Sequence, residues 1–452
     1  MDERKVISLF SGCGGMDLGL EQAGFETVIA NEMNPVACET LRRNKLLCTS
    51  TKRETERFID TAMEQKCYRN TDRSFLSRLK ATKKRKYLQE AKIIEADVRD
   101  LRLESFGINR EIIDLIAGGP PCQPFSKAGK QKSLEDKTNG DLFYEFVRIC
   151  KDVRPKAFLF ENVKGLTFTK TEVAYTDCMR CNSTEIVEYK HRNAAIQGYS
   201  APPCAACKST KTKIVSKKVA GGSLDIILNE FTRIGYQCSY KVLNSADFGV
   251  PQVRERLFIV GVKSGRFNDW PKPTHRPFNY DGRIIKNLKP WKSMRSTIWS
   301  NGHGTFGKIK ADAKLWVKNV VRPHDEPVTW DLDRPAPTIG AHQSAKLAFA
   351  PNGIPTEQLF RQQWHTLGRR QGDTKPVKVE HAYLSDRELL ILQSFPSWWY
   401  LHGTRMQRAF QIGNAVPPAL AKAIGIKIKN YLNELESKIA TGVSTGRVTT
   451  SA

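Results

Sequence analysis

Short apolar runs alternate with helical stripes along the first 160 residues. The run Val6–Phe10 predicts a buried strand, the stripe Met16–Ala23 a helix that ends at Gly24, and the run Thr27–Ala30 a second strand. Further strands of the same kind are predicted at 93–97, 112–117 and 156–160. Strands that alternate with helices in this way are typical of a parallel sheet covered by helices.

The same pattern returns in the second half of the chain. A helical stripe over 224–234 ends at Gly235, and strands are predicted over 236–244 and 256–262. Ser385 is a predicted helix N-cap, and a final helix is predicted from Gln411 to about Leu435. The sequence therefore predicts an α/β fold with a Rossmann-like sheet.

The pattern also predicts how the chain is divided into domains. We expect a Rossmann-like domain over 1–262, an irregular domain over 263–383, a return to the first domain over 384–436 and a loose tail over 437–452. In the irregular domain, basic residues are interleaved with Trp291, Trp299, Trp316 and Trp330, which suits contacts with DNA, although a small domain also needs aromatic residues for its own core.

Two insertions interrupt the first domain. Residues 41–92 are rich in Lys and Arg at loose helical spacing, so we expect a basic helical segment there. The basic face of this segment could contact DNA, but a solvated face that binds no ligand explains the pattern at least as well. The second insertion, 166–220, contains four of the cysteines.

Charge narrows the class of partner. The 452 residues include 72 Lys and Arg against 47 Asp and Glu, a formal net charge of +25. This excess of positive charge favours a polyanionic partner, of which nucleic acid is the first candidate and an anionic membrane the second. The alternative is a basic protein whose lysines are scattered over the surface and bind no partner. The 40% of hydrophobic residues excludes wholesale disorder.

Cysteine usage and the amino terminus predict the compartment. The eleven cysteines are an odd number spread over a long chain, which is unlike the disulfide framework of a small secreted domain. The apolar run Val6–Phe10 is too short for a signal peptide core, and no run approaches the length of a membrane span. We therefore expect a soluble cytoplasmic protein that does not bind a membrane.

The first predicted loop is rich in glycine. Ser11, Gly12 and Gly14 connect the first strand to the first helix, but position 17, where a dinucleotide-binding loop has its third glycine, is Asp17. Glu32 ends the second strand, where a carboxylate can accept both hydroxyls of a ribose. The combination suits S-adenosylmethionine better than NAD, although other Rossmann-like folds stay open on this loop alone.

The segment Gly118–Ser126 is the strongest functional signal. Two glycines and two prolines fix a loop after a buried strand and place Cys122 at the strand's carboxyl end, where ligands bind in α/β sheets. A lone cysteine is more often a small buried thiol, but prolines on both sides favour an exposed nucleophile. Asp97 and Glu161 follow neighbouring strands in the same manner. Lys127–Asn139 is polar and suits a mobile lid.

Two other motifs indicate sites. Arg254 and Arg256 occupy alternate positions at a strand entrance and are predicted to point the same way, although surface decoration explains such a pair equally well. Two Cys-x-x-Cys pairs are separated by 22 residues (182–203), a spacing typical of one tetrahedral structural zinc. The four predicted ligands are Cys178, Cys181, Cys204 and Cys207. An adventitious cluster and a redox pair are the alternatives, and we expect the zinc segment to project from the catalytic edge, where it could touch DNA.

In this order, the motifs resemble those of the DNA (cytosine-5) methyltransferase family of bacterial restriction-modification systems. The matching stretches are Phe10–Gly15, Glu32, Asp97, Pro120–Gln123, Glu161–Val163, Gln252–Arg256, Arg334–Pro335 with Thr338–Ile339, and Gly413–Asn414. They span nearly the whole chain. Each is weak alone, but the set is highly specific. The insertions at 41–92 and around the cysteine pairs lie outside the family's common core.

The resemblance implies a mechanism. Cys122 would add as a thiolate to carbon 6 of a flipped-out cytosine, and Glu161 would hold ring N3 and the 4-amino group. Arg254 and Arg256 would bind the base's O2 and the adjoining backbone. Carbon 5 would then take the methyl group of S-adenosylmethionine, and water or hydroxide would remove its proton.

The resemblance also implies cofactor contacts, a partner and a location. The cofactor would lie against Phe10, Ser11, Gly12, Gly14, Glu32, Met33, Asp97, Pro120, Leu142 and Asn414. Met33 departs from the aromatic residue that many relatives carry, which should weaken packing on the adenine. Residues 263–383 would be a target-recognition domain for double-stranded DNA. We expect a DNA-associated monomer in a bacterial cytoplasm, with a cognate restriction endonuclease acting on the same site without being bound.

Two other functions compete with this one. An RNA (tRNA) cytosine-5 methyltransferase would use the same site, but that branch carries a Cys-Phe-Thr element that this chain lacks. A non-catalytic DNA-binding regulator would not need Cys122, Glu161 and Arg256 intact. The amino-acid sequence does not predict the target DNA sequence, because base contacts in an irregular domain follow no positional code.

Overall fold

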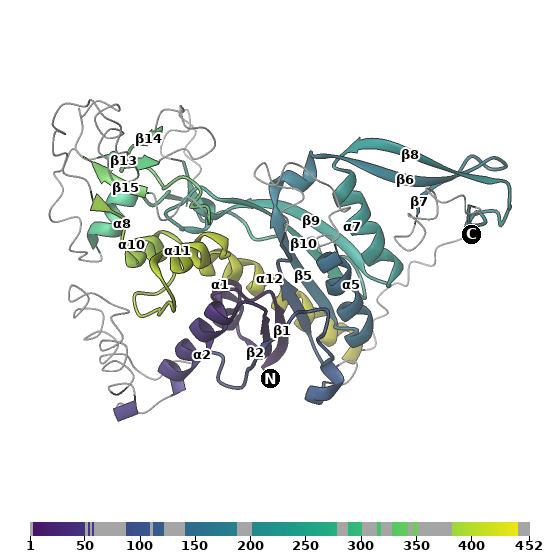
Figure 1. Cartoon of the computed structure of the whole chain (residues 1–452). Helices are drawn as coiled ribbons and strands as arrows, with labels where there is room; N and C mark the ends of the chain where they lie inside the picture. The colour runs from purple at the N-terminus through teal and green to yellow at the C-terminus, as the bar shows by residue number, and fades with distance from the viewer. Residues whose placement is uncertain are drawn as a thin grey trace, which may run out of the picture.

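A seven-stranded sheet forms the centre of the molecule (Figure 1). The structure is a computed structural model that describes residues 3–49, 53–54, 57, 87–108, 112–121, 141–187, 201–277, 288–300, 314–317, 328–341, 347–350 and 382–441. The strands are β1 (Arg4–Leu9), β2 (Phe25–Glu32), β3 (Lys92–Glu95), β4 (Leu115–Gly118), β5 (Ala157–Val163), β9 (Gln237–Asn244) and β10 (Glu255–Val262). Their order is β3-β2-β1-β4-β5-β10-β9.

The sheet confirms the predicted Rossmann-like class. Strands β3, β2, β1, β4 and β5 pair in parallel, and β10 runs antiparallel to both β5 and β9. Parallel strands end at one edge, so the loops after β1 to β5 meet there. Strand β5 continues through Glu161 to Val163, where the sequence predicted its end at Phe160.

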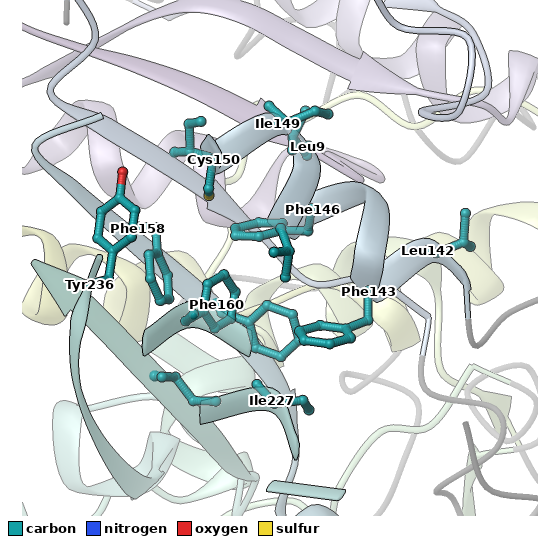
Figure 2. Close-up of a cluster of buried hydrophobic side chains, with 14 of the residues drawn as sticks. Leu9, Leu142, Phe143, Phe146, Ile149, Cys150, Phe158, Phe160, Ile227 and Tyr236 are labelled. Carbon is teal, nitrogen blue, oxygen red and sulfur yellow. The ribbon is translucent and has the colours of Figure 1, made fainter. Parts of the chain in front are cut away.

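Helices cover both faces of the sheet because alternate side chains of each strand point to opposite sides. On β1, Val6 joins an apolar cluster with helices α1 (Gly15–Gln22) and α12 (Pro418–Ala440). The next residue, Ile7, joins the opposite cluster with α5 (Asp141–Val153) and α7 (Gly222–Arg233). Figure 2 shows this second cluster, rich in phenylalanine from α5 and β5. Both strand faces are buried, which explains the continuous apolar runs.

Helix α12 returns the end of the chain to the first domain. A Cβ added at Gly19 of α1 would lie 2.5 Å from the carbonyl oxygen of Pro418 and 2.5 Å from the Cβ of Ala421. Only glycine allows two helices to approach this closely. The contact packs α12 directly against α1.

The helices before α12 differ from the prediction. Helix α10 (Asp386–Leu392) starts at the predicted cap Ser385, which forms a capping box with Glu388. Helix α11 (Arg405–Asn414) then ends where the final helix was predicted to begin. Pro417 and Pro418 stop one helix and start the next, because proline lacks the N–H of a helix interior but suits its first turn.

The remaining elements form smaller units. Helix α2 (Pro35–Thr49) packs Leu41 and Cys48 into the core, so residues 41–49 of the expected insertion belong to a core helix. Most of 50–86 lies outside the described residues. The other elements are η2 (Leu103–Phe106), η4 (Lys164–Thr167), β6 (Lys170–Cys178), β7 (Thr184–Ile186), β8 (Thr212–Ala220), η5 (Ser245–Phe248), β11 (His275–Arg276), β12 (Lys289–Pro290), α8 (Met294–Ser300), β13 (Lys314–Val317), β14 (Val328–Trp330), β15 (Leu347–Ala350) and β16 (Ala382–Tyr383).

Two small sheets extend from the central one at opposite ends of the molecule (Figure 1). Strands β14-β13-β15-β16 form a four-stranded antiparallel sheet within the predicted irregular domain. Strands β7-β6-β8 form a three-stranded antiparallel sheet in the cysteine-rich insertion, and we call its paired strands β6 and β8 the hairpin. Within the described ranges, none of the helices has the length and apolar character required to cross a membrane.

Candidate active site

The glycine-rich loop joins β1 to α1 in a left-handed backbone. Phe10, Gly12 and Gly14 have φ angles of 57°, 56° and 84°, and Gly14 is the N-cap of α1. The backbone N–H of Ser11 donates to the carbonyl of Asn31, and the N–H of Gly12 donates to Oε2 of Glu32 at 2.9 Å. The loop is therefore fastened to the end of β2.

Both carboxylate oxygens of Glu32 accept hydrogen bonds from the backbone. Its second oxygen, Oε1, accepts from the N–H of Asn34 at 2.8 Å. A carboxylate has about four acceptor positions, so Glu32 can still accept hydroxyl groups from a ligand. The neighbouring Met33 is 62% exposed and presents an apolar side chain at the same edge.

Asp17 occupies the place of a third glycine. It is fully buried in the first turns of α1, and the hydroxyl of Ser11 donates to it at 3.2 Å. Burial raises the pKa of Asp17 to about 6, although hydrogen bonds from Ser8, its own backbone and Ser11 oppose the shift. A buried acid here repels a phosphate, which agrees with the expectation that no pyrophosphate binds at this helix.

Asp97 lies beside the same edge, just after β3. The side chain of Asn31 donates to the carbonyl of Ala96 at 2.9 Å, which ties the end of β2 to this segment. Burial acts to raise the pKa of Asp97, but hydrogen bonds and charge from Arg99 lower it overall. Asp97 therefore stays ionised and remains a good acceptor for an amine.

The loop after β4 packs against the end of β5. A Cβ added at Gly119 would lie 2.6 Å from Oε2 of Glu161, so the loop backbone almost touches this carboxylate. The amide of Asn162 donates to the carbonyl of Pro120 at 3.5 Å. Pro121 is the last described residue here, and Cys122, together with the expected lid 127–139, lies outside the described residues.

Glu161 and Arg256 form an ion pair. Nε of Arg256 lies 3.1 Å from Oε1 of Glu161, and the two side chains are 15% and 13% exposed. The antiparallel register pairs Arg256 with Val163 and Phe258 with Glu161, which puts the two charged residues on the same face of the sheet. Burial raises the pKa of Glu161, while the charges of Arg256 and Arg254 oppose the shift.

Arg254 has a different environment from Arg256. It is 1% exposed, and its guanidinium donates to the carbonyl of Ile339 at 3.0 Å and to that of Gly413 at 2.9 Å. The segment around Ile339 belongs to the predicted second domain, and Gly413 precedes Asn414. One side chain thus joins three parts of the chain.

The neighbours of Arg254 strengthen the same junction. The side chain of Gln252 accepts from the N–H of Ile339 at 3.0 Å, and Val253 N–H donates to the carbonyl of Ala336 at 2.8 Å. The hydroxyl of Thr338 donates to the carbonyl of Val253 at 2.8 Å. No role was predicted for Gln252, Asn31 or Asn162, and only their positions next to Val253, Glu32 and Glu161 indicated one.

The last two expected cofactor residues lie near the same edge. Leu142, at the start of α5, is buried in one apolar cluster with Phe10 packed against it. Asn414 is exposed at the end of α11. The structure thus gathers Phe10, Ser11, Gly12, Gly14, Glu32, Met33, Asp97 and Pro120 around the carboxyl ends of β1 to β4, with Leu142 and Asn414 beside them.

The four predicted metal ligands come together. The Sγ atoms of Cys178, Cys181, Cys204 and Cys207 all lie within 4.8 Å of one another, and the pairs 178–207 and 181–204 are 3.6 Å apart. Four sulfurs about 2.3 Å from a central zinc are separated by about 3.8 Å, so these spacings fit a tetrahedral ion.

The two cysteine pairs have the same local geometry. The residue after each pair, Asn182 and Lys208, has a positive φ and donates its N–H to the carbonyl of the first cysteine, at 3.0 and 2.8 Å. Backbone N–H groups also point at sulfur, from Arg180 to Cys178 and from Cys207 to Cys204, both at 3.4 Å. N–H groups that face sulfur stabilise thiolates, which is the form that binds a metal.

Comparison with known proteins gives a consistent result. A model of the family described as C-5 cytosine-specific DNA methylase matches residues 4–72, 59–189 and 213–430. Type II methyltransferase M.AquIA of Picosynechococcus sp. is 33% identical over 303 residues, covering 66% of this chain and 88% of that protein. Type II methyltransferase M.NgoMIV of Neisseria gonorrhoeae is 27% identical over 432 residues, covering 95% and 98%. Type II methyltransferase M1.HphI of Haemophilus parahaemolyticus is 28% identical over 429 residues, covering 92% and 84%.

The family match has one interruption. It stops at residue 189 and resumes at 213, so it leaves out Cys204 and Cys207. The second cysteine pair is therefore additional to what the family model covers.

Proposed function

This chain belongs to the C-5 cytosine-specific DNA methylase family, and we propose that Cys122, Glu161 and Arg256 perform its chemistry on a flipped-out cytosine. Its activity is that of a DNA (cytosine-5-)-methyltransferase of the type II restriction-modification class, and its substrate is DNA. The observation that carries the assignment of residues is the Glu161–Arg256 ion pair beside the segment that leads to Cys122.

Cys122 supplies the nucleophile. Carbon 5 of cytosine does not attack a methyl donor unaided, but a thiolate that adds to carbon 6 converts the ring into an enamine with a nucleophilic carbon 5. A free thiol with a pKa of about 8.5 is mostly protonated at neutral pH, so positive charge from Arg256 favours the reactive form. Prolines precede and follow Cys122 in the sequence, which favours a loop over core packing at this position.

Glu161 stabilises the charge that the addition creates. Burial raises its pKa, so it holds a proton more readily than an exposed glutamate and can share it with ring N3 of cytosine. Its other oxygen can accept a hydrogen bond from the 4-amino group. The 3.1 Å contact with Arg256 orients the carboxyl group while leaving both functions available.

Arg254 serves as a positioning residue. Both ends of its guanidinium are engaged by the carbonyls of Ile339 and Gly413, and its charge still opposes the rise in the pKa of Glu161. These contacts support a role in aligning the second domain and Asn414 with the catalytic strands. Contact with the base is assigned to Arg256 alone.

The cofactor that the family implies is S-adenosylmethionine, and the described residues fit it. Nothing lies within 4 Å of the place where a Cβ would stand at Gly12, and Met33 is exposed, so this edge is open to a ligand. When bound, S-adenosylmethionine supplies an activated methyl group. Glu32 would accept the ribose hydroxyls, Asp97 the exocyclic amine of the adenine, and Asn414 and Leu142 would hold the opposite side.

The cysteine cluster is assigned to one structural zinc. Four thiolate ligands leave no open position for catalysis, so the ion would stabilise the hairpin β6–β8 rather than act on the substrate. Residues 263–383 are assigned to recognition of duplex DNA. We assign a monomeric state, with a cognate endonuclease that acts on the same site without being bound.

Methyl transfer to DNA tests the function directly. Duplex plasmid DNA and tRNA are each incubated with S-adenosylmethionine labelled in the methyl group, and bisulfite sequencing locates the product. The proposal expects label at one cytosine of a recurring sequence in duplex DNA. Preferential labelling of tRNA would favour the RNA alternative, and DNA binding without methylation would favour a regulator. Cys122→Ala is expected to bind DNA but to transfer no methyl group.

A further inference from the structure

A basic hairpin extends from the catalytic edge of the sheet. Strand β5, which contains Glu161, leads through η4 into β6, and β6 pairs with β8 over its full length from Lys170–Ala220 to Cys178–Thr212. Figure 1 shows β6 and β8 reaching outward beyond α7. A strand of nine residues spans about 30 Å, which is close to one turn of duplex DNA.

The hairpin is firmly joined to the first domain. The N–H of Gly221 donates to the carbonyl of Thr169 at 3.0 Å, which closes its base. The hydroxyls of Thr171 and Ser223 are 2.6 Å apart in a buried contact between β6 and α7. Val173 is fully buried, and a Cβ at Gly222 would lie 2.5 Å from it. The position of the hairpin is therefore fixed relative to Glu161.

The returning half of the hairpin is strongly basic. Residues 201–220 contain five lysines and no aspartate or glutamate. The five are Lys208, Lys211, Lys213, Lys217 and Lys218, and all of them are exposed. Throughout the described part of the chain, no ion pair joins any of the five to a carboxylate.

The lysines are arranged in a row. Lys213 and Lys217 occupy odd positions along β8 and so share one face, and Lys211 immediately precedes the strand. Across the ladder, Lys217 faces Val173 and Lys213 faces Asp177, while Lys218 on the other face stands opposite Glu172. The ammonium group of Lys217 lies 6.0 Å from the centre of the Tyr175 ring. Two acids on β6 are too few to neutralise the five lysines, and a row of cations without ion-pair partners attracts a polyanion.

We propose that the lysine row of β8 binds the phosphate backbone of the substrate duplex outside the target site. This inference rests on the proposed function, because it takes the duplex whose cytosine lies at Glu161 as the polyanion. Lysine is a flexible point charge that contacts phosphates without reading bases, so the row adds affinity and not sequence specificity. The hairpin thus provides a second DNA contact, separated from the recognition domain by the catalytic edge.

Charge-neutralising variants test the proposal. The hairpin variant is K211Q/K213Q/K217Q. The control is K5Q/K151Q/K438Q, which removes the same charge from exposed lysines at the amino-terminal edge of the sheet, away from Glu161. Binding to a random duplex of about 40 base pairs is measured between 50 and 200 mM salt. Each lost phosphate contact reduces the slope of log K against log salt by about 0.9, so three lost contacts change the salt sensitivity over this range by about 40-fold.

The expected result is a shallower salt slope and weaker binding for the hairpin variant, with the control close to wild type. Turnover at saturating DNA should be unchanged in both, because the lysines lie outside the catalytic residues. Equal slopes for the two variants, with zinc content and circular dichroism intact, would overturn the inference while leaving the proposed function standing. If the wild-type protein methylates no DNA, the proposed function fails instead.

Discussion

The guanidinium of Arg254 lies 2.9 Å from the carbonyl oxygen of Gly413, one residue before Asn414. The same group is 3.0 Å from the carbonyl oxygen of Ile339, in a segment of the second domain. One buried side chain therefore holds Gly413, 159 residues away in the sequence, and Ile339, 85 residues away. We propose that this contact couples cofactor binding to DNA recognition.

Arg254→Ala should impair both folding and cofactor binding. Truncation removes a buried cation and leaves two carbonyls without their donors, so we expect a loss of about 3–5 kcal/mol in the free energy of unfolding. Arg254→Lys keeps the charge but can reach only one carbonyl well, because lysine lacks the planar fork. For Arg254→Lys we expect a smaller loss of stability than for Arg254→Ala and a KM for S-adenosylmethionine raised about tenfold, the effect of losing about 1.4 kcal/mol.

Denaturant unfolding and steady-state kinetics measure the two effects separately. If Arg254→Lys changes the KM for DNA or the kcat but leaves the KM for S-adenosylmethionine untouched, Arg254 acts on the base and does not position Asn414 through Gly413. A lysine variant that loses stability as severely as the alanine variant would show a purely structural role.

The rate of methyl transfer should depend on the proton of Glu161. Burial raises the pKa of this carboxyl, so its protonated form persists to higher pH than in an exposed glutamate. The single-turnover rate should fall as pH rises through that value. Glu161→Gln cannot give a proton to N3, so we expect a loss of about 100- to 10,000-fold and no alkaline fall. A glutamine variant with wild-type rate and pH profile would contradict the assignment.

Much of this site was predictable from local patterns. Glu32, Asp97 and Glu161 each follow or end an apolar run, and parallel strands necessarily bring such ends together. The Cys-x-x-Cys pairs were predictable because their spacing encodes a closed loop. The role of Arg254 was not, because its partners Ile339 and Gly413 are distant in sequence and the bonds go to backbone carbonyls. Helix α11 was missed because the capping box Thr404–Gln407 lies in a polar stretch without a clear stripe.

The stability of the protein should fall as pH rises from about 4 to 7 because of its buried acids. Burial raises the pKa of Asp17 to about 6 and that of Glu21 to about 7, against unfolded values of about 3.9 and 4.3. Between the unfolded and folded pKa values, the folded state binds more protons than the unfolded state. The contribution of the two acids to the free energy of unfolding is therefore complete below pH 4 and is lost as pH rises through their folded-state pKa values.

Asp17→Asn should flatten this dependence. A shift of about two pKa units corresponds to about 3 kcal/mol, which sets the size of the expected change between pH 4 and pH 8. Urea unfolding at both pH values compares the wild type, Asp17→Asn and the exposed control Asp100→Asn. A wild-type slope that Asp17→Asn leaves unaltered would show that Asp17 is ionised in both states.

The cysteine cluster should bind about one zinc ion per chain. Cys204→Ser removes a ligand from the cluster and should lose the metal, whereas Cys238→Ser, outside the cluster, should keep it. Because metal binding of this kind is worth about 10–16 kcal/mol, hydrogen exchange in β6 and β8 should accelerate strongly without it, while α5 stays protected. Native protein with less than half a zinc per chain by mass spectrometry would refute the site.

The proposed mechanism depends on a bond between the sulfur of Cys122 and carbon 6 of the target cytosine. Once bisulfite sequencing has identified the target, a duplex with 5-fluorocytosine at that position is incubated with the protein and S-adenosylmethionine. Fluorine cannot leave as a proton does, so the intermediate is trapped. We predict a stable protein–DNA adduct whose proteolytic fragment carries the modification on Cys122. An adduct on another cysteine, or efficient methylation of ordinary DNA with no adduct on the fluorinated duplex, would contradict the mechanism.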